Sequence, residues 1–285
     1  MAERTPEDIY HCSSLPLRFS LLRLLQCRRL EEVKLRMRKK VKVLAHRGYR
    51  AKYPENSLLA FKKGFEYGAH GLECDVQKTS DGRYVIIHDD TIDRTAKDKK
   101  KGVVGEMTLK KLQTVDLGKK QTIPEINEFL ASIPEGKYVN MELKDETLLP
   151  SDGPELLEIF LKHVKKENLL VSSFDHSLLD YFKDQRIPIG LLLEEAHLSL
   201  GFTGIMKRVI KYRPAYMNLP VKMFDKIGKF PARILISIFK LMGCGIAFWT
   251  VNSREEFEHA YAFGDIIMTD EVEFILGELK KKEQG

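Results

Sequence analysis

The sequence predicts an α/β protein, a closed (β/α)₈ barrel, and three observations support this fold class. From residue 41 onward, short runs rich in β-branched residues alternate with helical patterns, which is typical of parallel βα units. Nine such runs are spread over the rest of the chain, a length that is usual for a barrel. The sequence also lacks the G-x-G-x-x-G turn that follows a strand in open dinucleotide-binding sheets.

The predicted strands occupy residues 41–45, 71–77, 84–88, 138–143, 169–174, 189–193, 215–219, 246–251 and 265–269. The clearest helical patterns between them occupy residues 57–68, 154–166, 176–184 and 254–264. The first of these helices has a start signal, with Asn56 or Ser57 as the N-cap and Pro54 just before it. We therefore expect one barrel domain at residues 41–285, preceded by an extension at residues 1–40.

One connection interrupts the alternation. "TSDG", residues 79–82, joins two strands without room for a crossover helix, so the two strands should form an antiparallel hairpin. Counting from this turn, residue 78 faces residue 83, which places Glu73 and His88 at a similar height in the sheet. Because nine strands are one more than the barrel needs, we expect one irregular hairpin strand.

The net charge of +6 is unevenly distributed. Residues 15–42 contain ten Lys or Arg and two Glu, a net +8, which leaves −2 for the rest of the chain. The body of the protein is therefore a poor candidate for binding nucleic acid. Its cysteines, Cys12, Cys27, Cys74 and Cys244, form no C-x-x-C pair, which argues against a zinc knuckle or a disulfide framework and fits a reducing, cytoplasmic compartment.

The sequence of the extension, residues 1–40, predicts a basic amphipathic helix. Its leucines recur at helical spacing, but Arg18 and Arg23 interrupt the apolar run, which is too short to span a membrane and a poor match to a secretory signal. Two interpretations stay open. The helix packs on the outside of the main domain, or it rests on an anionic membrane surface and gives peripheral contact through residues 15–42.

Catalysis in such barrels takes place at the carboxyl ends of the strands, so ionisable residues at those ends are the candidate site. Charged residues are rarely placed in strands without a partner or a metal. The candidates, in chain order, are His46 and Arg47, Glu73 and Asp75, His88, and Glu142 and Lys144, with Trp249 and Asn252 at the end of the "FWTVN" run.

Three of these residues suggest a metal site. Glu73, Asp75 and Glu142 would repel one another in one pocket, and a divalent cation would relieve the repulsion. An all-oxygen ligand set suits Mg²⁺ or Ca²⁺ and argues against zinc. The alternative is that each carboxylate pairs with a nearby Lys or Arg.

The two histidines match the needs of phosphodiester cleavage, in which one group deprotonates the attacking oxygen and another protonates the leaving oxygen. His46 and His88 suit both tasks because the pKa of histidine lies near neutrality. Arg47 and Lys144 would supply positive charge to a phosphate and its transition state. Lys144 could instead only pair with a neighbouring acid.

Five stretches, in this order, carry a family resemblance: "HRGYRAKYPENSLLAF", "GLECDVQKTSDGRYVIIHDDTIDRTAK", "VNMELK", "SSFD" and "FWTVN". From about Val43 to about Glu273 the chain resembles the glycerophosphodiester phosphodiesterase family. The resemblance implies a metal-dependent TIM barrel that hydrolyses glycerophosphodiesters to glycerol 3-phosphate and an alcohol. It also implies a small insertion after the third strand, of which the part after "VDLG" looks short.

The resemblance assigns roles residue by residue. It implies that His46 and His88 are the acid–base pair, that Glu73, Asp75 and Glu142 bind the metal, that Arg47 and Lys144 hold the phosphate, and that Trp249 forms an aromatic wall. A second interpretation is lysophospholipase D-like hydrolysis of membrane lysophospholipids, with the N-terminal helix on the membrane. A third is a non-catalytic scaffold, against which the intact set of histidines and carboxylates counts.

Three smaller expectations concern single residues. Glu55 could contact the site from its position just before the first helix. Cys74 should point to the helix layer, because it alternates with two residues that face the site. Gly48 should let the backbone turn away and leave room for substrate.

Overall fold

The computed structural model describes residues 41–194, 197 and 200–284. The predicted helix at residues 1–40 lies outside the described residues, so its two interpretations and the domain boundary stay predictions. Among the residues that the structure describes, no helix combines the length and the apolar character that crossing a membrane requires.

All nine predicted strands are present, with ends shifted by one or two residues. The strands are β1 (Lys42–His46), β2 (Gly71–Lys78), β3 (Tyr84–Ile86), β4 (Tyr138–Leu143), β5 (Leu169–Ser173), β6 (Ile189–Leu192), β7 (Tyr216–Pro220), β8 (Gly245–Trp249) and β9 (Ile266–Thr269). The α-helices are α2 (Leu58–Glu66), α3 (Leu109–Leu112), α4 (Ile126–Ala131), α5 (Gly153–His163), α6 (Asp180–Asp184), α8 (Gly201–Tyr212), α9 (Met223–Lys226), α10 (Lys229–Leu241), α11 (Arg254–Phe263) and α12 (Val272–Gln284). Short 3₁₀ helices occupy Val104–Glu106, Pro150–Asp152, Lys166–Asn168 and His176–Leu179.

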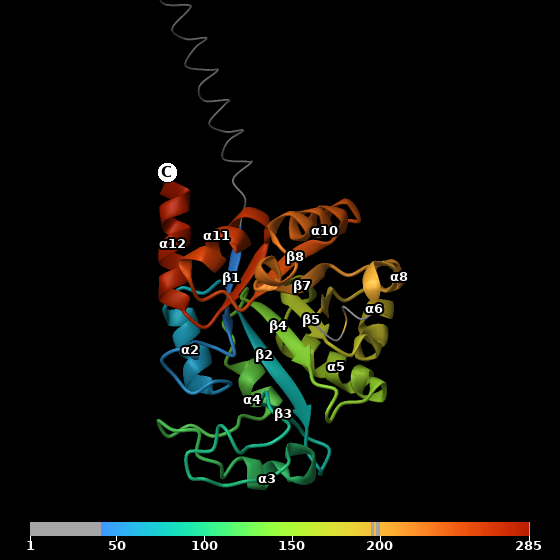
Figure 1. Ribbon diagram of the computed structural model, residues 1–285. Helices are drawn as coiled ribbons and strands as arrows, with labels where there is room; N and C mark the ends of the chain where they lie inside the picture. The colour runs from blue at the N-terminus through green and yellow to red at the C-terminus, as the bar shows by residue number, and fades with distance from the viewer. Residues whose placement is uncertain (1–40, 195–196, 198–199, 285) are drawn as a thin grey trace, which may run out of the picture. The chain divides into compact units, whose positions relative to one another are not determined.

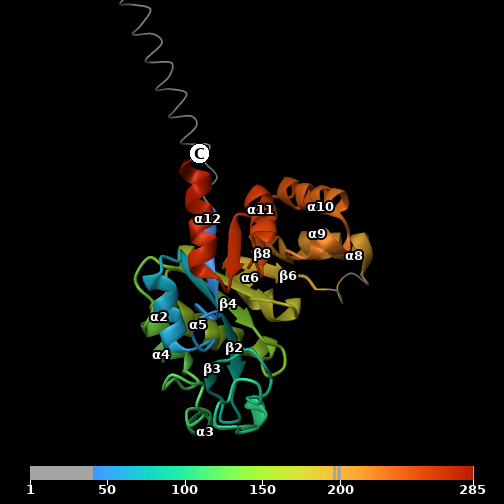
Figure 2. The same ribbon diagram turned by 60° about the vertical axis from the view of Figure 1, so that its left-hand side comes forward.

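Eight of the strands close into a parallel barrel. Strand β1 pairs with β2 on one side and with β9 on the other, and this closes the ring. The helices lie around the outside of the strands (Figure 1, Figure 2). Strand β3 pairs antiparallel with β2 alone and lies outside the ring, so it is an addition to the barrel rather than an irregular member of it.

The hairpin between β2 and β3 is present, but its predicted register was wrong by one residue. Lys78 pairs with Tyr84 and not with residue 83. The turn holds an extra residue because Thr79 binds Arg83 twice: its backbone N–H donates to the Arg83 carbonyl at 2.8 Å, and its hydroxyl accepts from the Arg83 N–H at 2.9 Å. Since β3 ends at Ile86, His88 lies on the loop that follows the strand.

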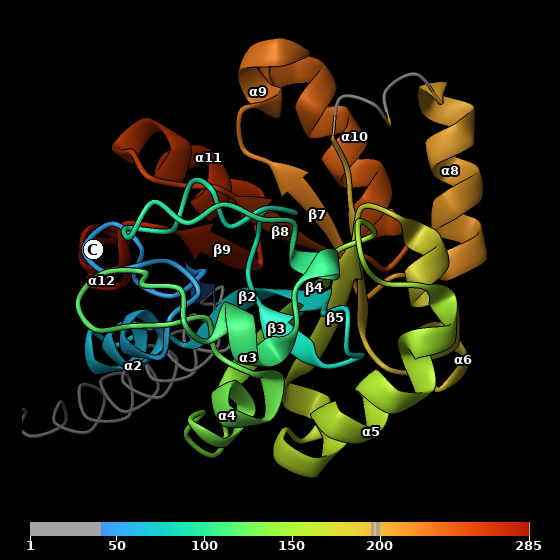
Figure 3. The same ribbon diagram turned by 90° about the horizontal axis from the view of Figure 1, so that it is seen from below.

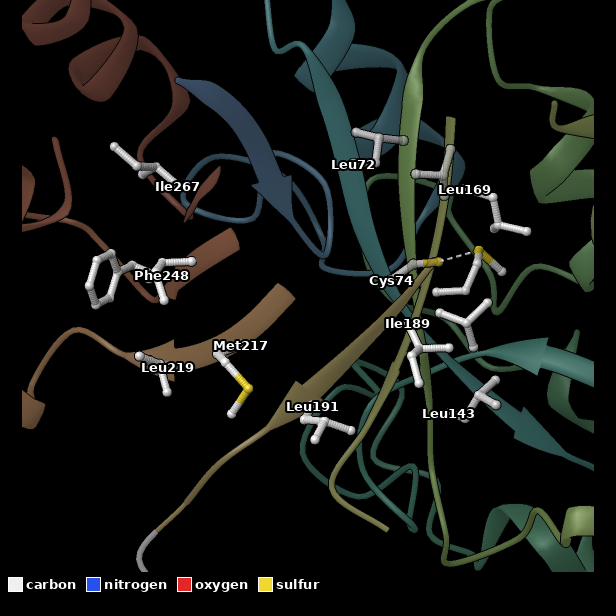
Figure 4. Close-up of a cluster of buried hydrophobic side chains, with 14 of the residues drawn as sticks. Leu72, Cys74, Leu143, Leu169, Ile189, Leu191, Met217, Leu219, Phe248 and Ile267 are labelled. Atoms are coloured by element: carbon white, nitrogen blue, oxygen red, sulfur yellow. Dashed lines mark hydrogen bonds between the residues drawn. The ribbon is translucent and has the colours of Figure 1, made fainter. Parts of the chain in front are cut away.

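Side chains on the barrel strands alternate between two environments, as strand geometry requires. Outward residues, Cys74 among them, pack against the helices in the main hydrophobic cluster (Figure 4). The Cys74 thiol is fully buried and contacts the Met141 sulfur at 3.5 Å, which confirms the predicted direction of this side chain. A smaller cluster, including Leu44, Leu170 and Met268, fills the interior below the site.

The insertion after β3 is present. Its residues form a separate hydrophobic cluster around Ile92, Val104, Leu112 and Ile123. In Figure 1 the arrows of β2 and β4 point towards this insertion and helix α3, so the insertion lies at the carboxyl ends of these strands. Figure 3 views the molecule from that side.

The first helix shows how local sequence positions the site. The Ser57 hydroxyl accepts from the Ala60 N–H at 3.2 Å and donates to the Pro54 carbonyl at 2.6 Å, so Ser57 is the N-cap. Gly48 has a φ of +77°, and a Cβ there would lie 2.6 Å from the Ala60 carbonyl carbon. The positive φ confirms the expected turn, and the absent side chain makes room for α2; the expectation that it also leaves room for substrate stays a prediction.

A methyl group at this glycine should be costly. We expect Gly48→Ala to lower the free energy of unfolding by about 2–5 kcal/mol, because it adds a backbone clash to a left-handed conformation. Gly82→Ala is the matched control: Gly82 has a φ of +73°, but nothing lies within 4 Å of its Cβ position. It should cost only about 1–2 kcal/mol. Urea denaturation measures both, and equal losses would contradict the packing argument.

Candidate active site

The barrel register brings the predicted residues together. Strand β1 pairs with β2 so that His46 lies beside Glu73, and β2 pairs with β4 so that Asp75 lies beside Glu142. Because residues two apart on a strand share a face, Glu73 and Asp75 point the same way. Lys144 follows β4 by one residue and shares the direction of Glu142.

The three carboxylates meet at the carboxyl end of the barrel. Glu73, Asp75 and Glu142 each offer an oxygen that lies within 4.8 Å of the others, and all three side chains are buried. One oxygen of Glu73 and one of Asp75 have no hydrogen-bond partner within the described residues. Buried carboxylate oxygens without a hydrogen bond are costly, so this group fits a cation with oxygen ligands, such as Mg²⁺ or Ca²⁺.

Mutual repulsion is visible in the pKa values of these acids. Burial, followed by Asp75 and Glu142, raises the pKa of Glu73 well above its usual value. Burial and Asp75 raise the pKa of Glu142 to about 7. Burial also opposes ionisation of Asp75, but Arg47 and Lys144 outweigh it and lower the pKa of Asp75 to about 2. The protein groups around Glu73, Asp75 and Glu142 therefore do not stabilise all three carboxylates in their ionised form.

The two predicted cations both contact these acids. The Lys144 ammonium lies 2.9 Å from Glu142 and 3.7 Å from Asp75. The Arg47 guanidinium lies 3.1 Å from Glu55 and 3.4 Å from Asp75. Glu55 thus contacts the site through Arg47, the less favoured of its two interpretations. Lys144 therefore pairs with neighbouring acids, which was one of its two interpretations. A contact between Lys144 and a substrate phosphate stays a prediction.

His46 is held by a residue from the far end of the chain. Its Nδ1 lies 2.7 Å from Asp270, which also accepts from the Asn252 amide at 2.9 Å. This contact orients the ring, and its other nitrogen, Nε2, lies 3.8 Å from Glu73. Burial lowers the pKa of His46, although the hydrogen bond to Asp270 opposes the shift, which favours the neutral imidazole that a base requires.

His88 is oriented in the same way by a different loop. Its Nδ1 lies 2.6 Å from Asp89, and Arg94 donates to Asp89 at 2.6 and 3.0 Å. Arg94 also donates to Glu55 at 2.8 and 2.7 Å. The guanidinium therefore ties the loop after β3 to the loop after β1. Burial lowers the pKa of His88 as well.

A small cavity of about 40 Å³ lies between these groups. Its walls include both histidines, Arg47, Glu73, Glu142 and Trp249, together with Asn140, Phe174, Leu192 and Met268. The Trp249 and Phe174 rings meet edge to face, with centroids 5.8 Å apart, and form an apolar part of the cavity wall. The arrangement suits a small ligand that has an anionic end and an apolar end.

The Arg94 bridge should contribute to stability in a pH-dependent way. Although burial of Glu55 opposes it, Arg94 and its neighbours lower the pKa of this carboxyl to about 2. A lowered carboxyl pKa means that the bridge stabilises the fold above about pH 4.5 and is lost as the pH falls towards 2. We expect Arg94→Met to cost about 1–2 kcal/mol of unfolding free energy at pH 7, and less at pH 3.

Arg83→Met is the control for this prediction, because Arg83 pairs with a single acid, Glu125, at 3.2 Å, whereas Arg94 bridges two acids, Glu55 and Asp89. It should cost about 1 kcal/mol or less. Thermal unfolding at both pH values measures the two variants. A loss in Arg94→Met that is the same at pH 3 and pH 7 would contradict the charge argument.

Comparison with known proteins matches the fold and the site. The family model for the glycerophosphoryl diester phosphodiesterase family matches residues 46–273, which span the barrel from His46 to Glu273. The chain belongs to this family. The predicted family and enzyme class are confirmed, and the scaffold interpretation loses its support.

Members of the phosphodiesterase family resemble this chain over nearly their whole length. The glycerophosphodiester phosphodiesterase of Caldanaerobacter subterraneus is 32% identical over 254 residues, which are 85% of this chain and 99% of that protein. The crystal structure of the Thermotoga maritima glycerophosphodiester phosphodiesterase has a TM-score of 0.71 at 32% identity, covering 84% of this chain and 98% of the other. An Oleispira antarctica phosphodiesterase, solved in complex with the product sn-glycerol-3-phosphate, has a TM-score of 0.74 at 25% identity, covering 84% and 96%.

All eight predicted site residues lie at one end of this phosphodiesterase-family barrel, although their roles stay predictions. Sequence analysis missed Asp270, Asp89 and Arg94. Asp270 had a signal, because it directly follows β9, as the other candidates follow their strands. Asp89 had a weaker one as the neighbour of His88. Arg94 lies inside the stretch ending in "DRTAK" that carries the family resemblance, but it was given no role there.

Proposed function

We propose that this chain hydrolyses glycerophosphodiesters to glycerol 3-phosphate and an alcohol, in a reaction that depends on a divalent metal. The observation that carries the proposal is the pair of histidines, each held at Nδ1 by its own carboxylate, in the wall of one cavity that Glu73 and Glu142 of the acid cluster also line. Two oriented imidazoles are what acid–base cleavage of a phosphodiester needs. The product bound in the Oleispira antarctica relative supports glycerol 3-phosphate as the product here.

Glu73, Asp75 and Glu142 would hold the metal, with Mg²⁺ and Ca²⁺ as the candidates. A bound divalent cation supplies positive charge that polarises the phosphate and stabilises its transition state. The buried oxygens of Glu73 and Asp75 that lack a hydrogen bond within the described residues support this assignment. So does the raised pKa of Glu142, which a cation would bring down.

His46 and His88 would divide the proton transfers. One accepts a proton from the attacking oxygen, either of water or of the substrate's glycerol 2-hydroxyl, and the other protonates the departing alkoxide. Asp270 and Asp89 keep each ring in position and stabilise its protonated form. Burial lowers the pKa of both rings and so favours their neutral forms, which suits the base; the ring that acts as the acid needs a proton before it can protonate the alkoxide.

Arg47 and Lys144 would supply charge to the phosphate oxygens, and Trp249 would cover the apolar side of the glycerol. Arg47 lies in the cavity wall with a left-handed φ of 54°. In this conformation its backbone N–H donates to the Glu73 side chain at 2.9 Å, which leaves the guanidinium beside the acids. An always-charged guanidinium suits a phosphate that arrives as an anion.

A turnover assay on a small panel tests the proposal. Glycerophosphocholine, glycerophosphoethanolamine and glycerophosphoglycerol are each incubated with the full chain in Mg²⁺, in Ca²⁺ and in EDTA. The proposal predicts release of alcohol with at least one metal and none in EDTA. Equal turnover with and without metal would rule out the metal, and no turnover of any diester under any metal would rule out the activity.

In the membrane interpretation the same residues hydrolyse a lysophospholipid that lies in a membrane, and not a soluble glycerophosphodiester. Comparison of soluble glycerophosphocholine with lysophosphatidylcholine in anionic vesicles, for the full chain and for the chain without residues 1–40, tests it. A selective loss on vesicles after deletion supports membrane contact through residues 15–42. Equal activity of both chains on vesicles contradicts it.

A further inference from the structure

A second pocket shares a wall residue with the proposed site. It has a volume of about 500 Å³, and Phe174, which directly follows β5, lines both this pocket and the small cavity between the two histidines. The rest of its lining comes from residues 175–177, from His197 and from one face of α8. Figure 3 shows α8 next to α6 on the same side of the barrel. We call this pocket the basic pocket.

The basic pocket carries an excess of positive charge. Its lining contains three cations, Lys207, Arg208 and Lys211, and a single acid, Asp175. Lys211 pairs with Asp180 of α6 at 3.2 Å. Within the described residues, Lys207 and Arg208 have no ion-pair partner. The side chains that face the pocket therefore leave positive charge available to an anion.

The three cations share one face of α8. Lys207 and Arg208 precede Lys211 by four and three residues, and residues at these spacings are neighbours on a helix surface. Like charges so placed weaken a helix by about 0.2–0.5 kcal/mol per pair, a cost that a bound anion would remove. The oxygens of Asp175 accept instead from the Ser177 N–H and hydroxyl, both at 2.9 Å, so this acid caps the 3₁₀ helix that follows it.

A buried histidine offers a further polar atom to the basic pocket. His176 lines the pocket and is only 5% exposed, and burial lowers its pKa to about 4, so its ring is neutral at pH 7. Its Nε2 lies 3.0 Å from the Leu192 carbonyl and donates to it, which leaves a lone pair on Nδ1. Nδ1 is buried and has no hydrogen-bond partner within the described residues. Since buried polar atoms normally have a partner, Nδ1 fits a ligand that brings an O–H group.

A row of aromatic rings links the two cavities. Neighbouring ring centroids are 5.8 Å apart from Trp249 to Phe174, 6.4 Å from Phe174 to His197, and 5.2 Å from His197 to His176. Trp249 lines the polar cavity, His176 and His197 line the basic pocket, and Phe174 lines both. A diester with its phosphorus at the catalytic end of this row would extend its alcohol towards the cations of α8.

We infer that the basic pocket binds a phosphate monoester on the alcohol half of the substrate, so that the substrate class is a soluble glycerophosphodiester of a phosphorylated polyol. The inference rests on the proposed function and names its substrate. A phosphate monoester carries a charge of about −1.5 to −2 at pH 7, and Arg and Lys side chains are its usual partners. Hydroxyls of the polyol would supply the O–H group for His176.

The volume and the chemistry agree with this substrate. About 500 Å³ lies within the range of pockets that hold small molecules, and it is ample for one polyol ring with its phosphate. In the overall hydrolysis, water's oxygen ends on the diester phosphorus and one of water's protons ends on the alcohol oxygen. The alcohol therefore leaves with its own phosphate monoester intact.

Two substrates that differ only in the second phosphate test the inference. Glycerophosphoinositol 4-phosphate and glycerophosphoinositol are compared in the full chain with Mg²⁺ or Ca²⁺, with glycerophosphocholine as the reference. The value of kcat/KM should be about 10- to 100-fold higher for the phosphorylated diester, the effect of one or two charge-assisted hydrogen bonds. A ratio of one or less, with glycerophosphocholine still hydrolysed, would overturn the pocket inference alone. If no diester is hydrolysed in any metal, the proposed function fails and the pocket inference fails with it.

A matched pair of arginine variants locates the effect. Arg208 lines the basic pocket, whereas Arg213 follows α8 as its C-cap, is exposed and lies outside the lining. Arg208→Met should lower the ratio of the two inositol diesters by about tenfold, and Arg213→Met should leave it unchanged. An equal fall in both variants would assign the preference to long-range charge and overturn the pocket. Thermal unfolding checks the fold, and Lys207→Met, at an exposed lining position, replaces Arg208→Met if the latter does not fold.

Inorganic phosphate distinguishes a substrate group from a free anion. If the preference for the phosphorylated diester falls as inorganic phosphate is added, and is already small in Arg208→Met, the pocket binds the substrate's own phosphate. A different result would overturn this assignment: a ratio of one for the two inositol diesters, with inorganic phosphate changing turnover of glycerophosphocholine in the unaltered chain but not in Arg208→Met. The pocket would then hold a free phosphate and not part of the substrate.

Discussion

Replacement of His46 by alanine should lower kcat/KM for a glycerophosphodiester by roughly 10²–10⁴-fold, the range for a lost acid–base group. The ring lies in the wall of the polar cavity and is fixed by Asp270 at 2.7 Å, and the other histidine of the cavity, His88, is needed for the second proton transfer. His88→Ala should have a loss of the same order. Steady-state kinetics in the preferred metal measures both.

His163→Ala is the control, because this histidine ends α5 and does not line the polar cavity. It should retain full activity. Asp270→Asn keeps the shape of the residue that positions His46 and removes its charge, so its activity should fall between those of the unaltered chain and His46→Ala. Near-normal turnover by His46→Ala would remove this residue from the chemistry.

Neutralising one of the three acids should have opposite effects on stability and on activity. Glu73→Gln removes a negative charge from a buried group in which the pKa of Glu73 is raised by burial and by two other acids. Without metal, we expect this variant to gain about 1–2 kcal/mol of unfolding free energy, because each pKa unit corresponds to about 1.4 kcal/mol. Its turnover should fall to the level measured in EDTA.

The gain in unfolding free energy on addition of metal distinguishes an acid that binds the metal from an acid that only stabilises the fold. In the unaltered chain, metal at about 100 times its dissociation constant should stabilise the fold by about 2.7 kcal/mol. Glu73→Gln should lose most of this gain, while Glu158→Gln, on an exposed face of α5, should keep it. A variant that is less stable without metal and still gains stability from metal would contradict the assignment of Glu73.

The sequence predicted the barrel well because its signals are local. Each strand is a short apolar run, and each turn and cap is set by nearby residues such as Ser57. The alternation along β2 was sufficient to put Glu73 and Asp75 on one face and Cys74 on the other. These inferences need only the two-residue period of a strand.

Predictions that depended on the exact path of a loop were less successful. The hairpin register was wrong because the Thr79 hydroxyl holds one more residue in the turn than a count of "TSDG" suggests. The close packing at Gly48 was not predicted, because it comes from Ala60 of α2, which lies against the position that a Cβ would take. Such contacts depend on where distant backbone passes, which a local pattern does not contain.

The residues that position the histidines show the same limit. Asp270 lies 224 residues from His46 in the chain, and they meet only because β9 closes the ring against β1. Arg94 joins two loops through Asp89 and Glu55, and it comes from an insertion without a strand of its own. The family motifs in the sequence indicate His46 and His88 as the reacting groups. The residues that orient these histidines become apparent only when the closed barrel brings distant segments together.

Phosphorus NMR of the products of glycerophosphocholine hydrolysis tests the central claim most directly. The account predicts that the metal-loaded full chain converts the diester signal into that of glycerol 3-phosphate with release of choline. It also predicts that the signal stays unchanged in EDTA and with His46→Ala over the same period. Formation of phosphocholine and glycerol, or the same rate of conversion in EDTA, would contradict it.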